Sequence, residues 1–493
     1  MGRMRTITAD LAIIGSGSGN SLITPFWDDR RVVIAERGVF GGTCLNAGCI
    51  PTKMYVRPAA LARSPEEAAR LGVAMRTEAV DWPGIRDRIF SRIDAISAAG
   101  ERYRAEDLDN VELISQEVRL TGARSFVAAD GTRVEAEQLV IAAGSRPVIP
   151  DIPGIGLPQV HTSDTVMRLA EQPGRVLIIG GGYVASEFAG IFAGLGSEVV
   201  QVVRGERLLR GLDAEISARF TAEAGRRWDV RLGCEVRGIE AARGGVARGG
   251  VTVEVGPTAR GAGDPAEAAD RAGAADRIPA DVVLVAIGRI PNSDLVGAAA
   301  AGLDLHADGR IVVDEFQRVR SGGAPVTGLY ALGDVSSPHQ LKHVANHEAR
   351  VVAHNLEHPD DLRRSRQEVV PAAVFSDPEL AQVGLTEREA GARIGAEHVT
   401  VATQRTGDTA YGWAMEDSTG VFTIVADRRD GRILGAHAMG YQASNLIQVV
   451  VMAMSFGIDA HAAARGQYWI HPALMEVVEN ALLGLDVPRG PEL

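Results

Sequence analysis

The sequence predicts an α/β protein with two doubly wound domains, followed by a separate C-terminal α+β domain. Two segments of the same pattern carry this prediction, residues 10–21 and residues 175–190. Each is a short apolar strand that runs into glycines and then into a helical pattern, and each is followed by a second strand, at residues 30–37 and 197–204. Residues 366–493 alternate strand and helix patterns without such a glycine-rich turn, which indicates the third domain.

Size and charge limit the function classes. The chain has 493 residues, enough for about three domains. Its net charge of -12 argues against nucleic acid as the main partner, because phosphate binding needs a basic face. No apolar run is long enough to span a bilayer and the N-terminus has no signal-peptide pattern, so we expect a cytoplasmic protein with no membrane partner.

The first glycine-rich segment has most features of a dinucleotide-binding turn. Gly15 and Gly17 fit the first two positions of G-x-G-x-x-G, where glycine permits a tight turn and a helix N-terminus faces a diphosphate. Asn20 stands at the third position in place of Gly or Ala. Glu36 ends the second strand, about 20 residues on, where an acidic side chain binds ribose hydroxyls. These features favour a Rossmann-like nucleotide site over an ordinary glycine-rich turn.

The second segment matches the pattern in full, with Gly180, Gly182 and Ala185. Arg204 stands at the end of its second strand, where an NAD site has an acidic residue, and Arg210 follows. Two guanidinium groups suit a 2′-phosphate, so we predict NADPH as the second nucleotide. The alternative is a solvated basic turn.

The remaining segments connect these units. Residues 55–110 have a mostly helical pattern and residues 111–150 alternate as strands do. Residues 241–280 are poor in large apolar side chains, which indicates a short hairpin with a long, mobile surface loop inserted in the second unit. Strand patterns resume at residues 281–292 and 328–335.

Cys44 and Cys49 are two of only three cysteines in the chain. On a regular helix their Cα atoms would lie about 8.6 Å apart, whereas a disulfide needs less than about 7 Å. Closing them requires a distorted turn, which residues 46–48 (Asn-Ala-Gly) permit, and a strained bridge is easier to reduce. In a reducing compartment such a pair is redox-active or binds metal, but residues 1–160 contain no other Cys or His as a further ligand. We expect the third cysteine, Cys234, to be a buried core residue.

The cysteine segment "GGTCLNAGCIPTK" resembles the redox-active signature of the flavoprotein disulfide reductases, which include glutathione reductase and dihydrolipoamide dehydrogenase. "YALGDV" is similar to that family's second FAD motif, "VFSDPELAQVGLTE" to the start of its interface domain and "HPALMEVVENAL" to its C-terminal catalytic motif. The resemblance implies an FAD-binding domain in two parts (1–150 and 290–365), an NADPH-binding domain (151–289) and a dimerisation domain (366–493).

The resemblance also implies roles for the residues that match its redox motif. Cys49 would lie next to the flavin, and Cys44 would attack the disulfide substrate. Lys53 would lie near flavin N5 and pair with Glu187, and a buried cation there favours the Cys49 thiolate. The implied contacts to FAD are Gly15, Gly17, Glu36, Gly42, Thr43, Lys53, Gly144, Gly333 and Asp334. The implied contacts to NADPH are Gly180, Gly182, Val184, Ala185, Glu187, Arg204, Arg210 and Gly288.

The C-terminal motif implies an acid–base pair. His471 would exchange the proton of Cys44, and Glu476 would orient the imidazole. In this family the pair comes from the partner subunit, so a homodimer is implied. No metal is expected, because His343 and His347 have the spacing of a metal pair but no third ligand is apparent.

Four longer stretches narrow the resemblance to mycothione reductases, the branch that reduces the disulfide of mycothiol. They are "IIGSGSGNSL", with its unusual Asn20, "LKHVANHEARVVAHNL", "DTAYGWAMEDSTG" and "GQYWIHPALMEVVENALLGL". The nearest alternative is an NAD-linked dihydrolipoamide dehydrogenase, which would carry an acid in place of Arg204. An alternative of another class is a flavin-binding interaction protein that kept the scaffold without the activity.

Overall fold

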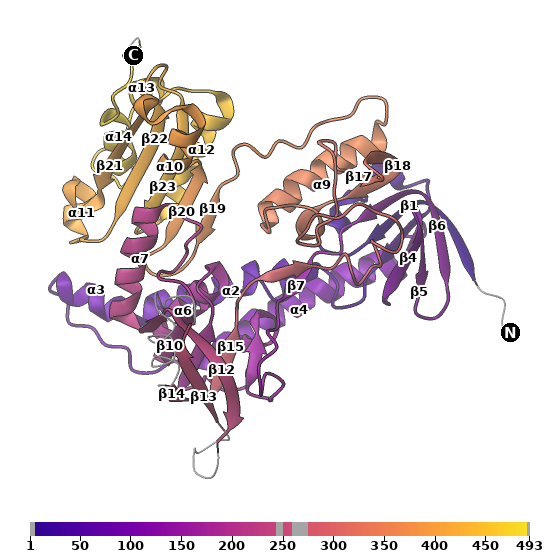
Figure 1. The fold of residues 1–493 in the computed structure, drawn as a ribbon, viewed down its shortest axis with the longest axis horizontal. Coiled ribbons are helices and arrows are strands. Elements are labelled where there is room, and N and C mark those ends of the chain that lie inside the picture. Colours follow the sequence, from indigo (N-terminus) through magenta and orange to yellow (C-terminus); the bar gives the residue numbers. More distant parts are fainter. Residues whose placement is uncertain (1–4, 243–249, 259–274, 491–493) are drawn as a thin grey trace, which may run out of the picture.

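The structure is a computed structural model that describes residues 5–242, 250–258 and 275–490. It contains two parallel-sheet domains and a C-terminal domain built on an antiparallel sheet (Figure 1). The predicted fold class is therefore confirmed. None of the helices in these residues combines the length and the apolar character needed to cross a membrane.

The first sheet is assembled from two distant parts of the chain. Its strand order is β17-β18-β6-β1-β2-β3, and all neighbours are parallel except β17 and β18. The strands are β1 (Thr6–Ile14), β2 (Val32–Ala35), β3 (Val111–Ile114), β6 (Arg133–Ile141), β17 (Arg318–Ser321) and β18 (Ala324–Ala331). A hairpin of β4 (Val118–Gly122) and β5 (Ser125–Ala128) joins β6. The chain thus leaves this sheet after β6, builds the second domain and returns.

The helix predicted after β1 is not present. Two short 3-10 helices occupy this place, η1 (Gly19–Leu22) and η2 (Pro25–Trp27). Glycine, asparagine and serine are poor helix formers, and Pro25 disfavours a helical conformation at the residue before it. Leu22 and Trp27 are buried and anchor the segment to the sheet. The prediction of a strand–turn–helix–strand unit is thus wrong for the first unit and right for the second.

The helical pattern at residues 55–110 is confirmed. The helices of this region are α1 (Gly42–Asn46), α2 (Cys49–Ala62), α3 (Ser64–Arg70) and α4 (Trp82–Glu106). Between the two parts of the first domain, β7 (Ser145–Pro147) pairs antiparallel with β16 (Arg289–Pro291). The return segment also contains η4 (Gly333–Val335) and α9 (Lys342–Glu357). A hollow of about 360 Å³ lies between the η1–η2 segment and α9.

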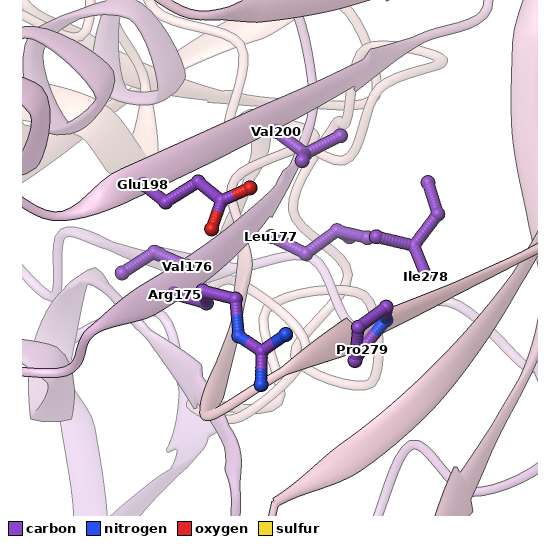
Figure 2. A pocket seen from close by; sticks show the side chains of 7 residues that line it. All are labelled: Arg175, Val176, Leu177, Glu198, Val200, Ile278 and Pro279. Atoms are coloured by element: carbon purple, nitrogen blue, oxygen red, sulfur yellow. The ribbon is translucent and has the colours of Figure 1, made fainter.

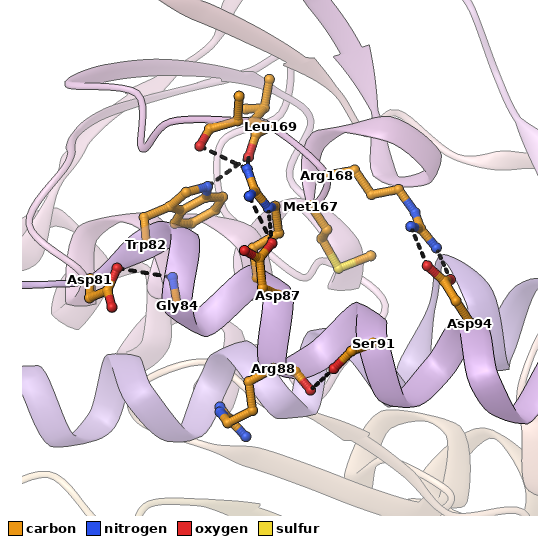
Figure 3. Close-up of polar contacts among 12 residues, drawn as sticks. Asp81, Trp82, Gly84, Asp87, Arg88, Ser91, Asp94, Met167, Arg168 and Leu169 are labelled. Carbon is orange, nitrogen blue, oxygen red and sulfur yellow. Dashed lines mark hydrogen bonds and ion pairs between the residues drawn. The ribbon is translucent and has the colours of Figure 1, made fainter.

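Helix α4 ties the first domain to the segment that enters the second. The Trp82 indole Nε1 donates a 2.9 Å hydrogen bond to the carbonyl of Leu169, and Arg168 forms an ion pair of 2.7 Å with Asp94 (Figure 3). Trp82 is almost fully buried and its ring stacks on Phe192, with 5.8 Å between centroids. These contacts hold α4 against the second domain.

The second domain contains a five-stranded parallel sheet in the order β11-β10-β9-β15-β8. Its strands are β8 (Val160–Thr162), β9 (Arg175–Ile179), β10 (Glu198–Val203), β11 (Asp229–Leu232) and β15 (Val282–Val285), and its helices are α5 (Ser163–Val166), α6 (Tyr183–Gly194) and α7 (Ala214–Arg227). An antiparallel sheet of β12 (Cys234–Ala241), β13 (Val251–Pro257) and β14 (Asp276–Ala280) is inserted. The hairpin predicted within 241–280 is thus confirmed, and most of its predicted loop falls on 243–249 and 259–274, outside the described residues. Cys234 lies at the start of β12 and is partly buried rather than fully buried.

The C-terminal domain is an antiparallel sheet in the order β19-β20-β23-β22-β21, covered by helices. Its strands are β19 (Ala372–Val374), β20 (Leu380–Gly384), β21 (Val399–Arg405), β22 (Val421–Asp427) and β23 (Ile433–Met439). Its helices are α10 (Glu387–Ile394), η5 (Ala396–His398), η6 (Thr406–Asp408), α11 (Ala410–Ala414), α12 (Ala443–Phe456), α13 (Ala460–Arg465) and α14 (Glu476–Leu483).

Candidate active site

Two glycine turns approach each other at the carboxyl end of β1. Gly15 has a φ of +107°, and a Cβ at this position would lie 2.3 Å from the carbonyl oxygen of Ala142. A Cβ on Gly42 would lie 2.6 Å from the Cα of Gly17. Any side chain here would separate the turn after β1 from the cysteine segment. The bare backbone on both sides therefore suits the close approach of a dinucleotide.

The acids predicted to bind sugar hydroxyls are held in place by hydrogen bonds. Glu36 accepts bonds from the backbone and the hydroxyl of Ser16, at 2.9 and 2.7 Å, and from the backbone of Gly38 at 2.8 Å. Asp334 accepts a 2.6 Å bond from the Ser145 hydroxyl through Oδ2. Each carboxylate oxygen can accept more than one bond, so both side chains can still bind a hydroxyl. This set of acceptors fits the ribose and ribityl chains of FAD.

The backbone between Cys44 and Cys49 breaks as the spacing predicts. Helix α1 ends at Asn46, and α2 begins at Cys49 after residues with non-helical dihedrals. The Asn46 side chain stabilises the break by donating to the carbonyls of Phe40 (2.9 Å) and Gly42 (3.1 Å). Both cysteines are free thiols in the structure, and their side chains are hydrogen bonded to each other. The break therefore brings the two sulfur atoms together.

The two thiols have opposite acidities. The hydrogen bond from Cys44, together with the positive charge of Lys53, lowers the pKa of Cys49 to about 7. The same hydrogen bond, together with burial, raises the pKa of Cys44. The pair therefore holds one proton on Cys44 and favours a thiolate at Cys49, which is the arrangement implied for a sulfur beside the flavin.

Lys53 connects three domains. Its Nζ lies 2.9 Å from both carboxylate oxygens of Glu187 on α6. Glu187 also accepts a 2.9 Å bond from the backbone N–H of Phe375, and the Phe375 ring lies 4.0 Å from Nζ. Glu187 thus accepts bonds from both the first domain and the C-terminal domain. Phe375 has no role predicted from the sequence, although the motif that begins the C-terminal domain contains it.

The second glycine turn lies at the carboxyl end of β9. Gly180 has a φ of +135°, and a Cβ there would lie 2.2 Å from the carbonyl oxygen of Ala286, which precedes Gly288. Gly182 precedes the first residue of α6, and Val184 lies in its first turn. Ala185 is fully buried, so its small side chain allows close packing of helix and strand rather than contact with a ligand.

The two arginines predicted for the 2′-phosphate are available. Arg204 directly follows β10, and Arg210 lies in the loop before α7. Both are exposed. Within the part of the chain that the structure describes, neither lies within ion-pair distance of a carboxylate. A phosphate group could therefore bind them without displacing an acid.

His471 and Glu476 lie together at the start of α14. The imidazole Nδ1 is 3.3 Å from Glu476 Oε2, and 66% of the His471 side chain is exposed. Helix α14 is well separated from α2, which begins at Cys49 and directly follows the short α1 that contains Cys44 (Figure 1). Within one chain the pair therefore does not meet Cys44.

Other polar clusters and hollows do not extend this site. The hollow in Figure 2, about 60 Å³, is lined by Arg175 and Glu198 at the amino ends of β9 and β10, opposite the edge where the glycine turns lie. His343 Nε2 bonds to the carbonyl of Pro371 at 2.8 Å. Among the described residues no three His, Cys, Asp or Glu side chains are grouped to hold a metal ion.

Comparison with known proteins agrees with this geometry. Residues 9–350 match the family model described as pyridine nucleotide-disulphide oxidoreductase, and residues 370–482 match the dimerisation domain of the same family. The chain belongs to the pyridine nucleotide-disulphide oxidoreductases. It is an FAD-containing disulfide reductase, and its dimerisation domain supports a homodimer.

Relatives cover almost the whole chain. A mycothione reductase of Mycobacterium tuberculosis is 47% identical, over 97% of this chain and 99% of that enzyme. A glutathione reductase of Burkholderia cepacia is 32% identical, over 96% of this chain and 98% of that enzyme. Among solved structures, the HOCl-induced flavoprotein disulfide reductase RclA of Escherichia coli superposes with a TM-score of 0.79 at 25% identity, over 96% of this chain and 99% of that chain.

Proposed function

We propose that the protein reduces mycothione to two molecules of mycothiol with electrons from NADPH. The observation that carries the proposal is the 47% identity to a mycothione reductase over nearly the full length of both chains. The glutathione reductase relative is more distant, at 32%. The cysteine pair supports disulfide reduction. Arg204 and Arg210, which have no ion-pair partner among the described residues, support NADPH as the electron donor.

The reaction follows from the roles of the two cysteines. Cys44 loses its proton to His471 and attacks one sulfur of mycothione, and the first mycothiol leaves with that proton. Cys49 then attacks Cys44 in the mixed disulfide, which releases the second mycothiol as a thiolate and forms the Cys44–Cys49 disulfide; the thiolate takes a proton from solvent. When bound, FAD supplies the two-electron relay between NADPH and this disulfide. Lys53 holds the Cys49 thiolate by charge, and Glu187 holds Lys53.

We propose that His471 and Glu476 act on the cysteines of the partner subunit. Their distance from α2 within one chain and the exposure of the His471 ring support this arrangement. We also propose the limits 1–150 and 290–365 for the FAD domain, 151–289 for the NADPH domain and 366–493 for the dimerisation domain.

One assay tests the substrate. NADPH oxidation is followed with mycothione, glutathione disulfide and lipoamide at equal concentrations, and each is repeated with NADH. We expect mycothione with NADPH to give the highest kcat/KM. A preference for lipoamide and NADH would instead identify a dihydrolipoamide dehydrogenase.

Replacing the attacking sulfur tests the chemistry. We expect Cys44→Ser to lose disulfide reduction by at least about a thousandfold, because a hydroxyl is a far weaker nucleophile than a thiol at neutral pH. The same variant should keep its FAD, measured by absorbance at 450 nm. Cys234→Ser, which changes the cysteine outside the pair, is the control and should keep full activity.

Replacing the two arginines tests the nucleotide. Arg204→Ala with Arg210→Ala removes the proposed charge partners of the 2′-phosphate, so KM for NADPH should rise about tenfold or more while KM for NADH stays within about twofold. Arg226→Ala, an exposed arginine on α7, is the control. An equal rise in KM for NADPH and for NADH would show that these arginines do not bind the 2′-phosphate.

A further inference from the structure

The first glycine turn lacks the helix that usually faces a bound diphosphate. In the second unit, α6 follows the turn with 12 residues. After Gly17 the structure has only η1, of four residues, and η2, of three. Short 3-10 turns sum few peptide dipoles, so they offer an anion little of the field of an α-helix N-terminus. The negative charge of the FAD diphosphate must therefore be balanced by other groups.

Arg104 approaches this turn from one side. It lies in the last turn of α4, where its Nε donates a 2.8 Å bond to the side-chain oxygen of Asn20 and its Nη2 a 3.2 Å bond to the Asn20 carbonyl. With its oxygen engaged, the Asn20 side chain presents its NH₂ group as a donor. Burial lowers the pKa of Arg104, so the guanidinium is held where water solvates it poorly.

Lys342 approaches the same turn from the other side. It is the first residue of α9, and its Nζ donates a 2.8 Å bond to the hydroxyl of Ser18. Its positive charge also opposes the rise in the pKa of Cys44. Throughout the described residues, neither Lys342 nor Arg104 lies within ion-pair distance of a carboxylate. Two partly buried cations without an anion are unusual in a chain of net charge -12.

We propose that Arg104 and Lys342 supply the positive charge that balances the FAD diphosphate in place of the missing helix. Each also positions a polar side chain of the glycine turn: Arg104 positions Asn20, and Lys342 positions Ser18. Asn20 is the residue that departs from the G-x-G-x-x-G pattern. In this proposal its side-chain NH₂ group, oriented by Arg104, donates a hydrogen bond to the diphosphate. The proposal rests on FAD binding and not on the choice of disulfide substrate.

Release of FAD from the purified holoenzyme tests the proposal without reference to activity. Free FAD fluoresces more strongly than bound FAD, so release after dilution is followed by fluorescence at low and at high NaCl. We expect Arg104→Gln and Lys342→Gln each to release FAD about tenfold faster than the unchanged protein, and the double variant faster still. NaCl should speed release from the unchanged protein and have less effect on the double variant, because salt screens charge pairs.

Conservative and matched variants separate charge from packing. Arg104→Lys and Lys342→Arg keep the charge and should restore slow release. Arg102→Gln removes an exposed arginine of the same helix α4 and should have no effect. Release within about twofold of the unchanged protein in both glutamine variants, or equally fast release from the lysine and glutamine variants of Arg104, would overturn the proposal. A protein that binds FAD in this way but does not reduce mycothione would contradict the proposed function alone.

Discussion

Three neighbouring side chains act on the pKa of Cys49, in addition to burial, which raises it. The hydrogen bond from Cys44 and the positive charge of Lys53 lower its pKa, whereas the negative charge of Glu187 raises it. Lys53 and Glu187 carry opposite charges and form an ion pair, so their effects on the pKa of Cys49 oppose each other. Removing either partner should therefore move the pKa of Cys49 in a predictable direction.

Lys53→Met should raise the pKa of Cys49, because it removes the cation and leaves the Glu187 carboxylate uncompensated. Below the pKa Cys49 is a thiol and reacts slowly with iodoacetamide, and above it the thiolate reacts fast. The midpoint of the alkylation rate against pH should lie near 7 in the reduced FAD-free protein and at higher pH in the variant. Mass spectrometry of the peptide that contains Cys49 measures the rate.

Glu187→Gln is the matched variant of opposite sign. It keeps the shape of the side chain and removes its charge, so the midpoint for Cys49 should move to lower pH. If both variants moved the midpoint in the same direction, the charges of this pair would not be the cause.

The sequence predicts the roles of the residues within the redox motif, but it does not predict which side chains from other parts of the chain contact them. The resemblance predicts the pair of Lys53 and Glu187, which lie 2.9 Å apart. Phe375, whose ring and backbone contact the same pair, carries no chemistry that a sequence pattern would single out. Lys342 stands at a helix start in a segment where only the fold brings it to Ser18.

At the scale of elements, the segment after β1 shows that the periodicity of apolar residues alone does not predict a helix. Its apolar residues Leu22 and Trp27 are both buried, as a helical pattern would require, but the structure buries them from two separate 3-10 turns. The low helix propensity of the glycine, asparagine and serine residues in this segment, together with Pro25, prevents the α-helix that the apolar pattern predicts. Asn20 in the sequence indicates that the first unit lacks the usual helix. Close packing of a helix on the strand needs a very small residue at the third position of the G-x-G-x-x-G pattern. The second unit has Ala185 there and forms a complete α6.

Helix α4 is anchored by a buried aromatic side chain at its start. Trp82 is buried between Tyr55 and Phe192, with ring centroids at 5.0 and 5.8 Å. Trp82→Ala should lower the free energy of unfolding by about 3–5 kcal/mol, because it removes a buried aromatic ring and leaves a cavity. Urea unfolding followed by circular dichroism measures the loss.

Trp82→Phe separates packing from the hydrogen bond in this prediction. It keeps a ring between the same neighbours but removes the bond from Nε1 to the Leu169 carbonyl. The loss should be smaller, about 1–2 kcal/mol. A loss as large as that of the alanine variant would mean that the hydrogen bond, rather than the packed ring, holds α4 in place.

In the whole molecule, the three domains of one chain meet at two groups of ion pairs. Lys53 and Glu187 join α2 to α6, and Asp377 at the start of the C-terminal domain contacts Arg63, which directly follows α2, and Arg227 of α7. These contacts set the C-terminal domain against both nucleotide domains. They do not bring α14 to α2, so one chain holds the cysteines and the acid–base pair in different places (Figure 1).

The surface around His471 indicates what completes the site. Tyr468 and Ile470 are 97% and 80% exposed, and Phe456 at the end of α12 is 79% exposed. Large apolar side chains that are this exposed are typical of a protein interface, and a homodimer interface is two-fold symmetric. The family's dimerisation domain covers all three residues. The proposed dimer, in which each His471 acts on the cysteines of the other chain, needs a second copy of the chain near this surface.

Heterodimers of two inactive variants test this arrangement. His471→Ala and Cys44→Ser, co-expressed with different tags and purified through both, give a dimer in which one site joins an intact cysteine pair to an intact His471 of the other chain. We expect each homodimer to be nearly inactive and the heterodimer to show about half of the unchanged rate, because one of its two sites is complete. If His471 served its own chain, both sites of the heterodimer would lack a catalytic group and the rate would stay near zero.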